Sequence, residues 1–260
     1  MRHKKNHPIF KALFLAAGLF LPVPRGWTLA ITPTIQNFEL APGESVEGEV
    51  LIANTEAESV SISPVSKNWF VLPANKKFKV EDWLTVDQEV FTLNGGESRK
   101  VRFKAKAPKK AQGELVGMIS FKTKSATMST VEFVLSGAVY VAVKGTEKFE
   151  GDIRAMMVMP SSESVKAGVL LRNTGNVHLR PIGIFKIFDD NDQPVANVEL
   201  EVGQPTYPGN LRSYLGEVKD LRMKPGKYVA HIDLVDRDRG AVIDRQKQKF
   251  LLMEDFKVKF

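Results

Sequence analysis

The 260-residue sequence contains no cysteine. This absence excludes disulfide bonds, thiolate zinc sites, iron–sulfur clusters, cysteine nucleophiles and a lipid-bearing N-terminal cysteine. Histidine is also scarce: only His178 and His231 lie beyond residue 30, and they are too far apart in sequence to have the spacing of a metal-ligand pair. We therefore expect no metal site.

Motifs for catalysis are missing as well. The chain has no G-x-S-x-G elbow, no P-loop, no H-E-x-x-H metal motif and no dinucleotide-binding glycine pattern. We expect no catalytic residue, no cofactor and no enzymatic activity. A hydrolase built on scattered Asp and Glu residues stays open as a distant alternative, because carboxylate pairs are recognised by geometry.

No apolar run is long enough to cross a bilayer. Residues 12–21 form an apolar run of about half the roughly 20 residues that a spanning helix needs. A basic head precedes this run, and two prolines and the small residue Ala30 follow it, which is the pattern of a secretory signal peptide. We predict a signal peptide over residues 1–30 and a mature chain without a membrane span, in the periplasm or at the cell surface. A retained anchor and a cytosolic chain are the alternatives.

The net charge of +7 would by itself suggest a polyanionic partner. Residues 1–30 carry five basic residues and no acidic one, so the 37 Lys and Arg residues fall to 32 against 30 Asp and Glu, a net charge of +2. Because the excess charge belongs to the export signal, we expect no nucleic-acid partner.

Helical periodicity is absent from residue 31 onward. Short runs with a period of two alternate with Gly, Pro, Asn and Asp turns, which is typical of antiparallel sandwiches. The polar stretch 144–148 is the first that is long enough to be a linker. We predict an all-β chain of two tandem immunoglobulin-like β-sandwich domains, over residues 31–148 and 149–260. The expected strands include 50–52, 60–62, 101–104, 115–122, 135–143, 153–159, 168–171, 182–188, 195–200, 228–234 and 250–253.

One segment recurs. Residues 44–55 (ESVEGEVLIANT) align without gaps to residues 163–174 (ESVKAGVLLRNT), at an offset of 119 residues and with identity at seven of the twelve positions. A duplicated domain and convergence of two similar sandwiches both explain this repeat.

Two local motifs indicate structure rather than chemistry. Pro225-Gly-Lys-Tyr228 resembles a tyrosine corner, in which the hydroxyl of a core tyrosine bonds the preceding loop. Residues 189–193 (DDNDQ) offer oxygens that suit calcium, but they lack the glycine and the distal glutamate of a calcium loop. A hairpin turn is favoured, because Asn and Asp bond their own backbone in turns.

Two tryptophans are candidates for a sugar-binding platform. Trp69 and Trp83 could stack on a glycan, yet apolar neighbours flank both, which favours packing in the core. A module that binds peptidoglycan or another glycan is therefore the alternative function.

Residues 131–143 (VEFVLSGAVYVAV) form the longest apolar β-run. At a sheet edge, such a strand would bind another strand through its backbone. The candidate residues for this role are Leu135, Val139, Val141 and Lys144. A central strand covered on both sides is the other interpretation, and apolar residues on both faces favour it.

Residues 31–145 resemble the PapD-like first domain of periplasmic pilus-assembly chaperones. The resemblance is carried by Ile31-Thr-Pro33, Leu40-Ala-Pro-Gly43, the Trp-Leu pair at 83–84, Leu93-x-x-Gly96 and Gly113-x-x-x-Gly-x-Ile-x-Phe121. The second half is similar to the immunoglobulin-like domains of bacterial surface proteins. Pilus chaperones hold the subunit's terminal carboxylate with an Arg in the first strand and a Lys in the last. Residues 31–40 contain no base, and Lys144 is the only base near the second position.

The resemblance implies an exported, non-enzymatic protein that acts by protein–protein contact in envelope or surface-appendage assembly. Its partners would be envelope or surface proteins, bound by β-strand addition.

Overall fold

The computed structural model describes residues 29–87, 89–125 and 132–260. The predicted signal peptide falls almost entirely on residues 1–28, which lie outside this described part. Strand β1 (Leu29–Thr32) begins before the predicted mature N-terminus at Ile31, so cleavage after Ala30 would leave only its second half.

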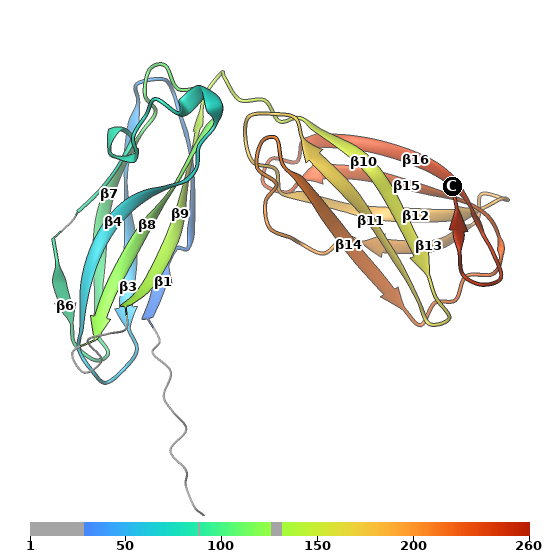
Figure 1. Ribbon diagram of the computed structural model, residues 1–260, viewed down its shortest axis with the longest axis horizontal. Helices are drawn as coiled ribbons and strands as arrows, with labels where there is room; N and C mark the ends of the chain where they lie inside the picture. Colours follow the sequence, from blue (N-terminus) through green and yellow to red (C-terminus); the bar gives the residue numbers. More distant parts are fainter. Residues whose placement is uncertain (1–28, 88, 126–131) are drawn as a thin grey trace, which may run out of the picture.

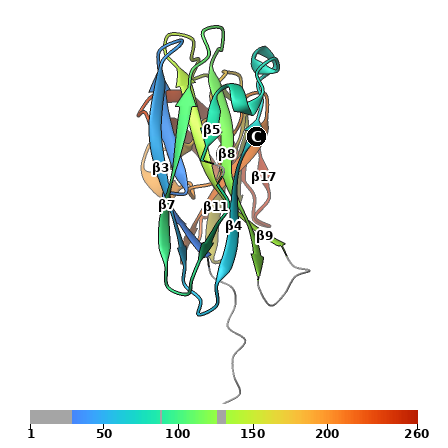
Figure 2. The same cartoon turned by 90° about the vertical axis from the view of Figure 1, so that its left-hand side faces the viewer.

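The described chain forms two β-sandwiches that are joined end to end (Figure 1). In the first, a four-stranded sheet of order β1-β3-β7-β5 packs on a five-stranded sheet of order β2-β9-β8-β4-β6. Figure 2 shows its strands running close to one common direction. The bounds of its other strands are β2 Ile35–Leu40, β3 Ser45–Asn54, β4 Val60–Phe70, β5 Leu84–Val86, β6 Phe91–Leu93, β7 Ser98–Lys106, β8 Glu114–Ser125 and β9 Glu132–Val143.

The second sandwich pairs a three-stranded sheet, β10-β11-β14, with a five-stranded sheet, β13-β12-β15-β16-β17. These two sandwiches confirm the predicted all-β fold class. The connection between them, residues 144–150, contains the position of the predicted boundary. The strand bounds are β10 Gly151–Pro160, β11 Ser164–Asn173, β12 Pro181–Asp189, β13 Pro194–Glu199, β14 Leu211–Lys219, β15 Gly226–Asp236, β16 Val242–Leu252 and β17 Val258–Lys259.

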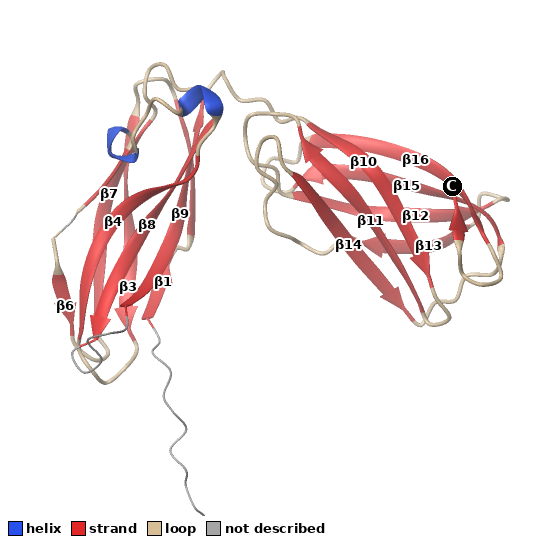
Figure 3. Cartoon of the chain, in the orientation of Figure 1, coloured by secondary structure: helices blue, strands red, loops and turns tan. Residues whose placement is uncertain are grey.

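Helical structure in the described residues is confined to two short 3-10 turns, Pro73–Asn75 (η1) and Val80–Asp82 (η2), at one end of the first sandwich (Figure 3). No described helix has the length and apolar character that crossing a membrane would require.

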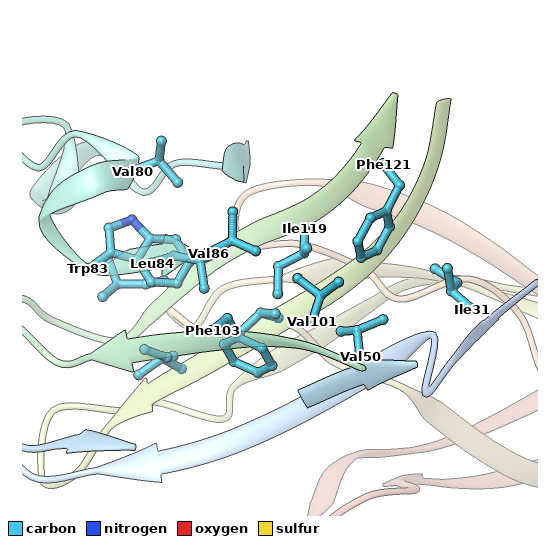
Figure 4. Close-up of a cluster of buried hydrophobic side chains, with 14 of the residues drawn as sticks. Ile31, Val50, Val80, Trp83, Leu84, Val86, Val101, Phe103, Ile119 and Phe121 are labelled. Carbon is cyan, nitrogen blue, oxygen red and sulfur yellow. The ribbon is translucent and has the colours of Figure 1, made fainter. Parts of the chain in front are cut away.

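The period of two in the sequence places one side of each strand in a core. In β7, Val101, Phe103 and Ala105 are buried, whereas Arg102 and Lys104 between them are exposed. Successive side chains of a strand point to opposite faces, so one face of β7 lies in the core and the other meets water. Figure 4 shows Val101 and Phe103 among the side chains of the first core.

The repeated segments form equivalent strands, β3 and β11, and each ends in a buried asparagine. Asn54 donates from Nδ2 to the carbonyl of Glu58 at 2.7 Å and accepts the N–H of Glu56. Asn173 donates to the carbonyl of Val177 at 2.7 Å and accepts the N–H of Gly175. Each side chain thus closes its own following loop, so the sequence repeat has a structural counterpart in both sandwiches.

The tyrosine corner is confirmed. Tyr228 packs in the second core, and its hydroxyl donates to the carbonyl of Lys224 at 2.6 Å. Burial raises the pKa of this hydroxyl, so it stays protonated and remains a donor.

The Asp-rich loop is a hairpin turn, as predicted. Asp189 Oδ1 accepts the N–H groups of Asn191 and Gln193, both at 2.9 Å, between β12 and β13. Across the described ranges, no three His, Cys, Asp or Glu side chains are grouped so that they could hold a metal ion.

Candidate functional site

Strand β9 is covered unequally on its two sides. On one side, β8 pairs with it from Glu132 to Ala142. On the other side, β2 runs parallel to it and pairs only with Ala138 to Val143. No strand in the described part of the chain pairs with residues 134–137 on the β2 side. We call this backbone face the open half-edge.

The backbone alternation shows which groups lie on the open half-edge. The N–H of Ala138 donates to the carbonyl of Thr34 at 2.8 Å, and the N–H of Lys144 donates to the carbonyl of Leu40 at 2.9 Å. Even-numbered residues of β9 therefore face β2. By the same alternation, the N–H and C=O groups of Val134 and Ser136 face the open half-edge.

The open half-edge exists because the N-terminal β-segment is divided into two strands, β1 and β2, which belong to different sheets. Strand β1 pairs with β3 in one sheet, and after Pro33 the chain crosses to the other sheet and continues as β2 beside β9. The crossing passes beside Gly137, where a Cβ would lie 3.5 Å from the carbonyl oxygens of Pro33 and Thr34. The strand that covers the second half of β9 therefore cannot also cover its first half.

The candidate side chains of β9 point mainly into the first core. Val139 and Val141 are fully buried there, and Leu135 packs against the same cluster. Lys144 is exposed, and its backbone N–H is already bonded to β2. Val134, on the opposite face, is 51% exposed. A partner strand at the open half-edge would therefore meet the backbone first.

A buried carboxylate–imidazole pair connects the two sandwiches at the end of β9 away from the open half-edge. Glu114 begins β8, and His178 lies between β11 and β12; both are almost completely buried. His178 Nδ1 lies 2.8 Å from each carboxylate oxygen of Glu114, and its backbone N–H donates to Oε2 at 3.1 Å. Because a buried carboxylate without partners is very unfavourable, this pair strongly favours contact between the sandwiches.

Arg180 completes the pair on the side of the second sandwich. Its Nε donates to His178 Nε2 at 3.3 Å and lies 3.1 Å from Asp238 Oδ2. These contacts place the imidazole proton on Nδ1, facing Glu114. The guanidinium carbon lies 5.6 Å from the ring centroid of Tyr140, a second contact between the sandwiches.

Tyr140 connects β9 itself to the second sandwich. Its ring lies 4.3 Å from that of His178, and its hydroxyl is 2.9 Å from the hydroxyl of Tyr207. Burial, and next the hydrogen bond with Tyr207, raise the pKa of Tyr140, so this hydroxyl stays protonated. Tyr140 and Ala142 are buried on the face of β9 opposite to the core, so the second half of the strand is covered on both faces.

The connection between the sandwiches is held by hydrogen bonds. Thr146 Oγ1 accepts the N–H of Gly113 at 2.8 Å, and Asn176 Nδ2 donates to the carbonyl of Thr146 at 2.8 Å. Gly113 has a φ of +63°, and a Cβ at this position would lie 2.4 Å from the Asn176 carbonyl oxygen. Only glycine permits this approach. We call the contacts of Glu114, Tyr140, residues 144–150, His178, Arg180 and Tyr207 the interdomain joint.

The two tryptophans have different environments. Trp83 is buried in the first core, as Figure 4 shows, and its Nε1 donates to Asn68 Oδ1 at 3.4 Å. Trp69 is 57% exposed, and its Nε1 donates to the hydroxyl of Tyr207 at 2.8 Å. Trp83 thus presents no ring face to a sugar, and the polar atom of Trp69 is bonded within the interdomain joint.

Sequence reasoning missed Glu114, His178 and Tyr207 as joint residues. The sequence presents His178 only as an isolated histidine without the spacing of a metal ligand. One signal was present: a histidine and a glutamate in otherwise apolar, β-rich surroundings need partners if they are buried. The sequence does not show which residues those partners are.

No family model matches the chain, and no curated protein matches it. Among solved structures, the class 5 fimbriae chaperone CfaA is 16% identical over 86% of this chain and 98% of its own, with a TM-score of 0.44. The Pseudomonas aeruginosa CupB2 chaperone is 10% identical over 85% of this chain and 98% of its own, with a TM-score of 0.42. A PapD-like domain of human CEP192 is 14% identical over 52% of this chain and 97% of its own, with a TM-score of 0.39.

Proposed function

We propose that this chain is an exported, non-enzymatic binding protein that takes up an extended segment of another envelope or surface protein along the open half-edge of β9. One observation carries the proposal: the β2–β9 ladder ends at Ala138, although β9 continues to Glu132 and is paired there with β8. A paired strand with one bare side is a template for a further strand.

The local chemistry supports backbone recognition. Val134 and Ser136 present N–H and C=O groups outward, and both residues belong to a strand that β8 holds in register. Val134 adds an exposed apolar side chain beside them. Export and the envelope partner class belong to the proposal, with support from the signal-peptide pattern of residues 1–30 and the sequence resemblance of residues 31–145.

A site-specific crosslink tests this proposal in the full chain. A photoreactive phenylalanine at position 134 should capture a protein partner in the native cell envelope. The same residue at Val242, an exposed position of β16 in the second sandwich, serves as the positional control. An adduct that forms equally from both positions, or no adduct from position 134, would contradict binding at the open half-edge.

The backbone requirement is tested by Ser136→Pro. Proline removes the outward N–H of Ser136 and puts its ring in the path of a partner strand, while the bonds to β8 come from neighbouring residues. The adduct from position 134 should disappear. Ser136→Ala is the matched control, because it removes only the hydroxyl, which bonds Ser120 at 2.8 Å, and keeps the N–H. If Ser136→Pro retains the adduct, the partner is not bound through this backbone.

A further inference from the structure

Strand β4 contains a bulge where it reaches the second sandwich. In the β4–β8 ladder, Asn68 pairs with Gly117 and Phe70 with Val116, so Trp69 between them has no partner in this ladder. Consecutive residues of a regular strand point to opposite faces. Here the extra residue lets Trp69 and Phe70 both reach Tyr207, which agrees with the known ability of bulges to redirect side chains.

Tyr207 is the point where these groups converge. Its hydroxyl accepts the indole N–H of Trp69 at 2.8 Å and bonds the hydroxyl of Tyr140 at 2.9 Å. Its ring stacks on Phe70, with centroids 4.9 Å apart and an interplanar angle of 20°. One side chain of the second sandwich thus contacts two strands of the first.

The loop that carries Tyr207 is firmly anchored. Thr206 exchanges two backbone hydrogen bonds with Leu179, at 2.9 and 3.0 Å, and its hydroxyl lies 2.6 Å from that of Tyr214. Its carbonyl accepts the side chain of Asn173 at 2.8 Å. Prolines at 205 and 208 restrict the backbone on both sides of Tyr207. Tyr207 is therefore held in place by its own sandwich.

We propose that Trp69, Phe70 and Tyr207 form an interdomain latch that holds the two sandwiches in one arrangement, and that Tyr207, through Tyr140, is a positioning residue for β9. The latch itself is inferred from the contacts alone. The positioning role of Tyr207 rests on the proposed function, because β9 is the strand that carries the open half-edge. The latch differs from the Glu114–His178 pair in being accessible to solvent: Trp69 is the large aromatic at its rim.

The latch is tested by the indole N–H resonances of the full chain, which has three tryptophans. Trp69→Phe assigns the Trp69 signal by its loss. Tyr207→Phe removes only the hydroxyl, and the exchange of the Trp69 N–H with water should become about tenfold faster, the change expected for one hydrogen bond of about 1.4 kcal/mol. Tyr228→Phe is the matched control, because it removes a tyrosine hydroxyl from a loop that does not touch Trp69. Unchanged exchange in Tyr207→Phe would overturn the latch.

A second variant tests the arrangement of the sandwiches. Tyr207→Ala also removes the stacking on Phe70, and the radius of gyration from solution X-ray scattering should increase while circular dichroism stays that of a folded chain. An unchanged scattering curve would overturn the claim that these residues hold the arrangement.

The yield of the crosslink from position 134 tests whether Tyr207 positions β9. This yield should fall severalfold in Tyr207→Ala, although that substitution leaves the residues of the open half-edge unchanged. If scattering changes but the crosslink yield does not, the latch stands and the positioning role is wrong. If position 134 gives no adduct even in the otherwise unchanged chain, the proposed function fails, and exchange and scattering still decide the latch.

Discussion

The Glu114–His178 pair makes a sharp prediction about stability, because its two members belong to different sandwiches. Removing one partner of a buried hydrogen bond leaves the other group buried without its partner, which costs about 1–3 kcal/mol and more when that group is charged. Glu114 accepts two hydrogen bonds from His178, one from Nδ1 and one from the backbone N–H. The substitution Glu114→Ala removes both, whereas His178→Ala removes only the side-chain bond.

A double-mutant cycle therefore isolates the side-chain bond, which as a hydrogen bond to a charged group should contribute about 1.5–3 kcal/mol. We expect the double variant to be destabilised by less than the sum of the two single variants, by about 2 kcal/mol. The hydrogen bond from the His178 backbone is lost both in Glu114→Ala and in the double variant, so its contribution cancels from the coupling energy.

Tryptophan fluorescence during urea unfolding is the assay. Beyond residue 30, the only tryptophans are Trp69 and Trp83, both in the first sandwich, so the signal reports that sandwich. The decisive observation is the effect of His178→Ala: a substitution in the second sandwich should lower the unfolding midpoint of the first. If that midpoint does not move, or if the two single effects simply add, the pair does not couple the sandwiches and our interpretation of the interdomain joint is wrong.

Two further predictions concern β9 and the tyrosines. Val139→Lys buries an unpaired charge in the first core and should lower the free energy of unfolding by about 4 kcal/mol or more. Val134→Lys is the control: it lies at an exposed position and should change stability by less than about 0.5 kcal/mol. Thermal unfolding measures both variants, and equal losses would contradict the assigned faces of β9. Burial raises the pKa values of Tyr140, Tyr214 and Tyr228 above 10.0. Above pH 10 the native state therefore binds more protons than the unfolded state, and the free energy of unfolding should fall as pH rises further. Tyrosinate absorbance and urea midpoints across this range check it, and midpoints that stay constant above pH 10 would refute it.

Features that depend on neighbouring residues could be predicted from the sequence. The bond of Tyr228 to Lys224 and the turn around Asp189 close within four residues, so their residue types are visible together in a short segment. The same holds for Asn54 and Asn173, which each bond the carbonyl four residues later. Strand positions followed from the period of two for the same reason, because alternation is local.

The interdomain joint could not be predicted, because its partners are far apart in sequence. Glu114 and His178 are separated by 64 residues, Tyr140 and Tyr207 by 67, and Trp69 and Tyr207 by 138. Periodicity shows which face of a strand is apolar, but it carries no information about which residue from another element will cover that face. The apolar residues on both faces of residues 135–143 indicated a strand covered on two sides. The structure shows that the second cover comes partly from the other sandwich.

By itself, the sequence determined a cysteine-free, all-β chain of two sandwiches, whose strands alternate between core and solvent. Only the tertiary structure decided which half of β9 is open and which residues connect the sandwiches. The physical reason is the same in both cases. A strand edge is open or covered according to where another segment runs, and β2 covers only the part of β9 that lies beyond the crossing at Pro33. That crossing depends on how the two sheets pack, and it cannot be predicted from the residues of β9 itself.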